Sequence, residues 1–110
     1  MEINPEDKRR FGEDSTPILE DNARAAARRF GVRLVLGERE VRLGDLEAAF
    51  DGGEISAGRL RAPAGEAEWR AFKALLLSFF INYKRAPGEA ELRELLFAAT
   101  GSEKIFTKDE

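Results

Sequence analysis

The spacing of apolar residues along the chain predicts three helices, of which the longest spans residues 66–84. Apolar positions in this segment recur every three or four residues, which is typical of a helix with a buried face. A first helix is expected over residues 16–30 and a last one over residues 89–100, each followed by a glycine that can end it. The broad apolar stripe of the longest helix consists of Trp69, Phe72, Leu75, Leu76, Phe79, Phe80 and Tyr83.

Alternation of apolar and polar residues around Gly37-Glu38 predicts a β-hairpin over residues 32–43. A two-residue turn with glycine first favours a type II′ turn, which would pair residue 36 with 39, 34 with 41 and 32 with 43. In this register Arg33 lies directly opposite Arg42 on the outer face. The inner face would carry Val32, Leu34, Leu36, Val41 and Leu43. A lone hairpin is marginally stable, so we expect a helix to cover that face.

The segment that follows predicts a short helix and then a loop. Asp45 is a suitable N-cap for a helix over residues 46–50, and Gly52-Gly53 would end it. Residues 54–65 are rich in glycine and favour a loop with one short strand near Ile55. The expected fold class is therefore α+β and mainly helical: a helix, a β-hairpin, a short helix, and two C-terminal helices joined by a proline turn.

Domain organisation follows from length and local composition. A chain of 110 residues is typical of one domain, which we expect over residues 16–106 with a short tail at 107–110. Residues 1–15 are mostly charged or polar and cannot bury enough surface to offset their ordering entropy, so a flexible arm is predicted. The polar N-terminus and the lack of a long apolar run predict a cytoplasmic protein with no membrane contact.

The composition excludes several chemistries. The chain contains neither cysteine nor histidine, which rules out disulfides, thiolate nucleophiles, Cys/His zinc sites and imidazole acid–base catalysis. Pairs of carboxylates such as Glu89 and Glu91 lie in polar surroundings, which is typical of a solvated helix start and not of a catalytic pair. No loop has the ligand spacing of a metal site. We therefore expect no enzyme activity, no cofactor and no metal.

Arginines are concentrated between residues 23 and 44, where only two glutamates oppose them. Like charges that face each other across two strands destabilise the pair, and such a violation of a local rule points to function. An acidic protein surface or a phosphate backbone would fit this cluster, while pairing with nearby glutamates is the structural alternative. The candidate partner-binding residues are Arg28, Arg33, Arg39 and Arg42.

The longest helix also carries a second, narrower apolar stripe formed by Ala74, Leu77 and Ile81. A helix that is apolar on two sides is either central to the core or has a partner on one side. This stripe would either receive the first helix and the hairpin or form the seam of a homodimer or another complex.

Together these features predict a non-catalytic binding or regulatory protein that docks on a protein partner. The alternative is a weak nucleic-acid-binding protein that uses the arginine-rich hairpin. The net charge of −3 disfavours nucleic acid, as do the glutamates at positions 89, 91 and 94, which phosphates would repel at the start of the last helix.

The C-terminal third resembles a known family. Residues 69–104 are similar to the helix–proline–helix core of the sulfite reductase gamma-subunit and sulfur-relay (DsrC/TusE) family. The matching positions are Phe79, Phe80, Tyr83, Ala86, Pro87, Leu92, Leu96, Gly101, Glu103 and Lys104. Trp69 also resembles the family's tryptophan, offset by about one residue. Members of that family transfer sulfur through cysteine, and this chain has none. The resemblance therefore implies a shared helical core and a docking surface without sulfur transfer.

Overall fold

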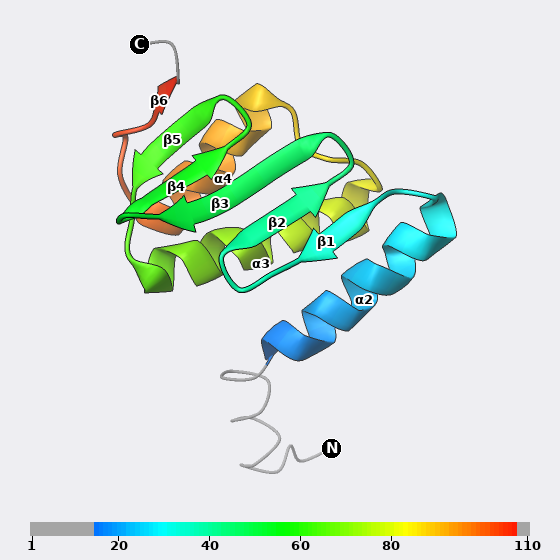
Figure 1. The fold of residues 1–110 in the computed structure, drawn as a ribbon. Helices are drawn as coiled ribbons and strands as arrows, with labels where there is room; N and C mark the ends of the chain where they lie inside the picture. Colours follow the sequence, from blue (N-terminus) through cyan, green and yellow to red (C-terminus); the bar gives the residue numbers. More distant parts are fainter. Residues whose placement is uncertain (1–14, 108–110) are drawn as a thin grey trace, which may run out of the picture.

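A computed structural model describes residues 15–107 of the chain (Figure 1). The helices are α2 (Ser15–Phe30), α3 (Glu66–Tyr83) and α4 (Glu89–Thr100). The strands are β1 (Leu34–Leu36), β2 (Glu40–Leu43), β3 (Leu46–Asp51), β4 (Glu54–Ala57), β5 (Leu60–Pro63) and β6 (Phe106–Thr107). The arm and tail expected from the sequence lie outside the described residues, apart from Ser15, which opens α2, and Thr107, which closes β6.

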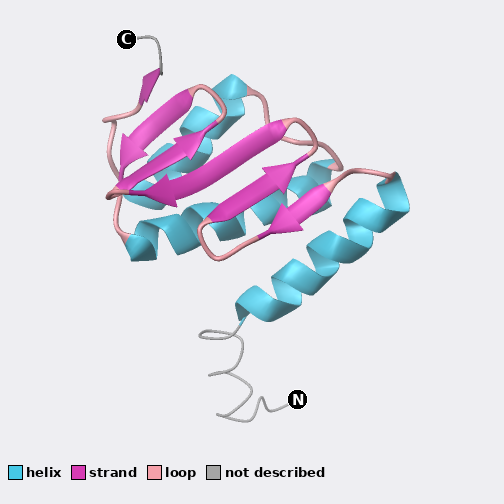
Figure 2. Ribbon diagram, in the orientation of Figure 1, coloured by secondary structure: helices cyan, strands magenta, loops and turns pink. Residues whose placement is uncertain are grey.

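The six strands form one antiparallel sheet in which each strand pairs with the next in sequence. Helices α3 and α4 pack together and cover one face of this sheet, while α2 packs on α3 and lies beside β1 (Figure 2). No helix among residues 15–107 is long and apolar enough to cross a membrane. The covered face carries Leu34, Leu36, Val41, Leu43, Ala48, Phe50, Ile55, Ala57, Leu60 and Ala62.

The expected mainly helical fold with a single hairpin is wrong, although the class remains α+β. The segment expected as a short helix is β3, and the segment expected as a loop forms β4 and β5. In β3, buried Ala48 and Phe50 alternate with exposed Glu47 and Asp51, which is the period of a strand. Short apolar runs fit either period, and the paired strands decide between them.

Glycine-first turns connect these additional strands. Gly44, Gly52 and Gly58 each begin a two-residue connection with φ between +58° and +61°. A positive φ at the first central residue matches the right-handed twist of the flanking strands and is sterically open to glycine. Positive φ at the first central residue alone, as expected at Gly37, is therefore found at Gly44 and Gly58, while Gly52-Gly53 has positive φ at both central residues.

The first hairpin has a different register from the expected one. Leu36 pairs with Val41 and Leu34 with Leu43, so residues 37–39 form a longer connection. The indole N–H of Trp69 donates to the Glu38 carbonyl at 2.8 Å, and this contact draws the connection onto α3. The pairing is shifted by two residues, which preserves the face of every side chain.

This shift removes the expected clash between Arg33 and Arg42. Arg42 lies opposite Val35 on one side and Glu47 on the other. Arg33 lies opposite Gly44, whose N–H donates to the Arg33 carbonyl at 2.8 Å. The like-charge pair that pointed to function is therefore absent from the described residues.

The three long helices begin and end close to the expected residues. Gly31 and Gly101 follow α2 and α4 in the left-handed conformation, with φ of 68° at both. Lys84 takes the same conformation after α3, with φ of 62°, and is the one non-glycine residue of the described chain to do so. The core beneath the sheet is formed by the large side chains of α3, namely Trp69, Phe72, Leu76 and Phe80.

Candidate partner-binding groove between α2 and β1

Two of the four candidate arginines are paired within the chain. Arg39 lies 3.6 Å from a carboxylate oxygen of Glu66, and Arg42 lies 3.7 Å from one of Glu47. The side chains of both arginines and both glutamates in these pairs are more than half exposed. Exposed ion pairs contribute roughly 0–1 kcal/mol each to stability. The structural alternative of internal neutralisation therefore describes these two residues.

Arg28 and Arg33 differ from the paired arginines. Both are exposed, and neither makes an ion pair with any residue between positions 15 and 107. Arg28 lies on the last turns of α2, and Arg33 lies in the connection between α2 and β1. The two candidate arginines without an ion pair to a described residue therefore come from one region of the fold.

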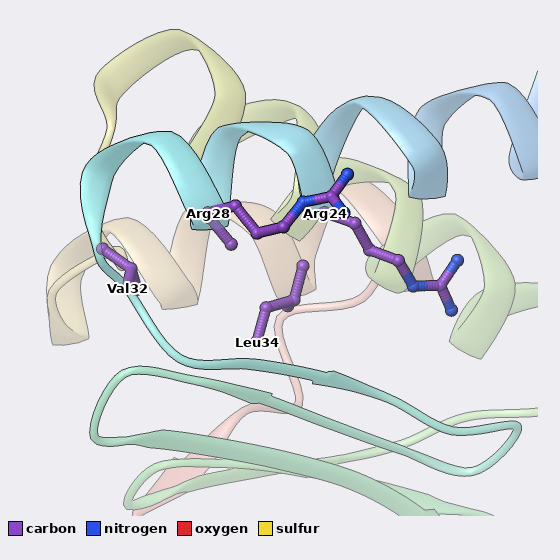
Figure 3. Close-up of a pocket in the computed structure, with 5 residues that line it drawn as sticks. Arg24, Arg28, Val32 and Leu34 are labelled. Carbon is purple, nitrogen blue, oxygen red and sulfur yellow. The ribbon is translucent and has the colours of Figure 1, made fainter.

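Arg28 lines a groove between α2 and β1 (Figure 3). Arg24, Ala27 and Arg28 are spaced three and four residues apart, which places them on one face of the helix. Leu34 points from the strand side toward this face, with Val32 at the closed end. The cavity has a volume of about 280 Å³.

The end of α2 explains why β1 lies beside this helix. Gly31 adopts a left-handed φ of 68°, and the Val32 N–H donates to the Ala27 carbonyl at 2.9 Å. A glycine at this position, with a bond back to the last turn, is the Schellman arrangement. It reverses the chain, so that β1 runs back beside the helix that precedes it.

Small side chains on α2 leave the groove unfilled. The helix buries Ala23 and Ala27 and half-buries Ala26, where α3 presents large aromatic and aliphatic groups. An alanine side chain cannot reach across the distance between a helix and a strand. The groove therefore has an apolar floor of Ala27, Val32 and Leu34 below two arginines.

The charge on the groove wall is positive. Arg24 lies 3.7 Å from the exposed carboxylate of Asp21, while Arg28 makes no ion pair with a described residue. No carboxylate of the described residues lines the groove. An anionic group attached to an apolar body fits this combination of wall and floor.

The carboxyl group with the largest pKa shift among the described residues lies outside the groove, at the start of α4. Glu91 accepts two hydrogen bonds from the Arg85 guanidinium, at 2.8 and 2.9 Å, and one from the Gly88 N–H at 2.9 Å. These bonds, chiefly those from Arg85, lower the pKa of Glu91 to about 2. Because Glu91 caps α4, this cluster clamps the turn between α3 and α4.

The second stripe of α3 is largely covered by the chain. Leu77 is fully buried, and Ala74 and Ile81 are half-buried. Helix α2 packs on α3, and Ala23 of α2 is also fully buried. Leu77 is therefore not available to a second chain.

Exposed aromatic rings form a separate patch where α2 and α3 end. Phe30 is 40% exposed and Tyr83 is 61% exposed. The Lys84 ammonium lies 5.3 Å from the centre of the Phe30 ring, and the Arg85 guanidinium lies 5.9 Å from that of Tyr83. Both distances are typical of cation–π contacts.

No family model, curated protein or solved structure matches this chain. The resemblance to the DsrC/TusE family therefore stays a prediction.

The sequence also carries a signal for the groove that the distribution of charge alone does not reveal. Arg24, Ala27 and Arg28 share a helix face, and the Gly31-Val32 reversal directs the next strand under it.

Proposed function

We propose that this chain is a non-catalytic binding or regulatory protein that docks on a protein partner, and that the α2–β1 groove is the docking site. The observation that carries the proposal is the placement of Arg28, which makes no ion pair with residues 15–107, over an apolar floor. A cation without a partner beside apolar surface gains both charge pairing and burial when an acidic partner binds.

The distribution of charge supports an acidic partner. The chain has a net charge of −3, yet the charged residues that line the groove in the described part of the chain are Arg24 and Arg28. Such a local concentration steers oppositely charged surfaces toward the groove and repels basic ones. Arg33 and Arg42 lie on the outer face of the hairpin, away from the groove, so Arg24 and Arg28 supply the positive charge of the site.

The family resemblance agrees with a docking role. A cysteine-less relative of the DsrC/TusE family would keep the helix–proline–helix core and its contacts with other proteins. It could not carry sulfur, because a thiolate is required for that chemistry.

The test compares two arginines that differ in position alone. We expect Arg28→Glu to weaken binding of a fluorescein-labelled peptide of alternating glutamate and valine by about tenfold or more, read by fluorescence anisotropy. Arg70→Glu is the control, because Arg70 is also exposed but lies outside the groove. Equal losses from both variants, or no binding to the unaltered protein, would contradict the proposal.

Weak nucleic-acid binding is the second candidate. It is supported by the exposed rings of Phe30 and Tyr83 with Lys84 and Arg85 beside them, since bases stack on aromatic side chains flanked by cations. Single-stranded DNA should then bind with an affinity that falls steeply with salt. Tyr83→Ser should weaken that binding, while Arg28→Glu should change it less.

A further inference from the structure

Building on the proposed function, we propose that the free edge of β1 takes up an extended acidic segment of the partner as an additional strand. The backbone of that segment would pair with β1, and its acidic side chains would reach Arg24 and Arg28 across the groove. This mode of binding uses main-chain hydrogen bonds for affinity and the groove for selection.

The register shows which backbone groups of β1 are free. Arg33 and Gly37 are hydrogen-bonded to β2, because the Gly44 N–H donates to Arg33 and the Gly37 N–H donates to Glu40, both at 2.8 Å. Bonded and non-bonded residues alternate in an antiparallel pair. Leu34 and Leu36 therefore direct their N–H and C=O groups away from β2, toward the edge.

The edge lacks the usual protection against strand addition. β1 has the sequence Leu-Val-Leu, with no charge and no proline, and Val35 is 41% exposed on the outer face. Natural edge strands are commonly blunted by lysine, proline or a bulge. Within residues 15–107, β1 is protected by its short length but not by a lysine or proline in the strand, so a suitable segment can still pair with it.

The position of α2 leaves the edge accessible. Figure 3 shows Leu34 pointing from the strand toward α2, with Arg24 and Arg28 on the helix above it. The cavity of about 280 Å³ between them can take side chains of an added strand. A strand placed along β1 would thus lie under the two guanidinium groups.

These placements define the chemistry of the segment. Side chains alternate between the two faces of a strand, so every second residue of the segment would point toward Arg24 and Arg28. Acidic residues suit those positions, and apolar residues suit the other face, beside Val35. A second copy of this chain fits poorly, because pairing two β1 edges would bring two arginine-lined grooves together.

The decisive probe is a peptide of about eight residues that alternates glutamate and valine, a length that spans a short strand. Two further versions carry N-methyl groups on all glutamate amides or on all valine amides. The amides of alternate residues point to opposite sides of a strand. Strand addition predicts that one methylated version loses about tenfold or more in affinity, while the other binds within about twofold.

Hydrogen exchange in the full chain locates the contact. We expect the Leu34 and Leu36 amides to exchange fast in the free protein and to become protected when the unmodified peptide binds. Protection in the free protein would mean that another segment or a second copy already pairs with this edge, and it would overturn the proposal. Sedimentation would tell these two occupants apart.

A pair of variants tests the groove without altering charge. Ala27→Leu should fill the cavity and weaken binding of the peptide by about tenfold. Ala25→Leu, on the exposed side of the same helix, should leave binding unchanged. Should Ala27→Leu fail to fold, Arg28→Glu provides the comparison. If both methylated peptides bind as well as the unmodified one, strand addition is wrong and acidic docking stands. If none of the peptides binds, the proposed function is wrong as well.

Discussion

Helices α3 and α2 lie side by side, yet they pack in opposite ways. Helix α3 places Trp69, Phe72 and Phe80 under the sheet, and the Trp69 ring stacks on Phe50 with a centroid distance of 6.0 Å. Helix α2 offers alanines to the same layer and leaves a groove lined by arginines. The difference shows that α3 supplies large side chains to the core, while α2 leaves a space between itself and β1 unfilled.

The largest expected effect is the loss of stability when a core side chain of α3 is removed. Phe80 is fully buried, and we expect Phe80→Ala to lower the free energy of unfolding by about 3–5 kcal/mol, because it removes apolar contacts and leaves a cavity. The matched change on α2, Ala23→Gly, should cost about 1 kcal/mol. Urea denaturation measures both. Similar losses from the two variants would contradict the contrast between the helices.

The next effect concerns the side chain that joins the two regions. The Lys73 ammonium donates to the Gly37 carbonyl at 2.7 Å and lies 3.5 Å from a carboxylate oxygen of Glu20 on α2. Its side chain is 13% exposed and that of Glu20 is 22% exposed. We expect Lys73→Met to cost about 1–3 kcal/mol, because it leaves a largely buried carboxylate and a carbonyl without their donor.

The double variant Lys73→Met with Glu20→Leu separates the loss of the ion pair with Glu20 from the loss of the hydrogen bond to the Gly37 carbonyl. It should recover part of the loss, since both charges of the pair are then absent. Lys104→Met is the control, because Lys104 is exposed and makes no ion pair with a described residue. If Lys73→Met costs no more than Lys104→Met, α2 is not held through this contact.

A smaller effect on stability, which appears only at acidic pH, is expected for Glu91 beyond the C-terminal end of α3. The pKa of Glu91 is lowered from 4.5 to about 2, chiefly by the hydrogen bonds from Arg85. A carboxyl group with a lowered folded-state pKa stabilises the fold above its unfolded pKa and loses that contribution as the pH falls. The contribution should therefore be complete above pH 4.5 and vanish as the pH approaches 2.

Melting temperatures across this range check the prediction. Glu91→Gln should lower the melting temperature at neutral pH, and its difference from the unaltered chain should shrink as the pH falls from 4.5 toward 2. Glu94→Gln serves as the control, since Glu94 lies on the same helix, is exposed and forms no ion pair with a described residue. A difference that is constant with pH would show that Glu91 does not act through its charge.

The smallest effect is expected for Arg42→Thr. Arg42 lies 3.7 Å from Glu47 with both side chains largely exposed, so the change should alter the free energy of unfolding by less than about 0.5 kcal/mol. Threonine keeps the β propensity of this strand position. A loss above about 1 kcal/mol would mean that Arg42 belongs to a stronger network on the open face of the sheet.

Local signals in the sequence were sufficient for the helices. Proline near the start of α2, acidic residues at the start of α3, and glycines after α2 and α4 act within one or two turns, so their effect does not depend on the rest of the fold. The inward face of the first hairpin was also predictable, because Leu34 and Leu43 stay on one face under any even shift of register.

Contacts between distant residues settled the rest. The register of the first hairpin depends on Trp69 and Lys73, which bind the carbonyls of Glu38 and Gly37 from more than 30 residues away. Likewise, the segment around Ala48 fits a helix or a strand on its own, and pairing with β2 and β4 selects the strand. The pattern of apolar and polar residues does not specify these contacts, because they join residues that are far apart in the sequence.

The candidate site divides in the same way. That α2 carries arginines on one face and alanines where it packs can be read from the residue spacing, since helical geometry fixes which side chains are neighbours. Which arginines remain unpaired could not be read in this way. Glu66 reaches Arg39 and Glu47 reaches Arg42 only once the sheet and α3 are assembled. Arg28 is left over the groove because the alanines of α2 are too short to fill the space between this helix and β1.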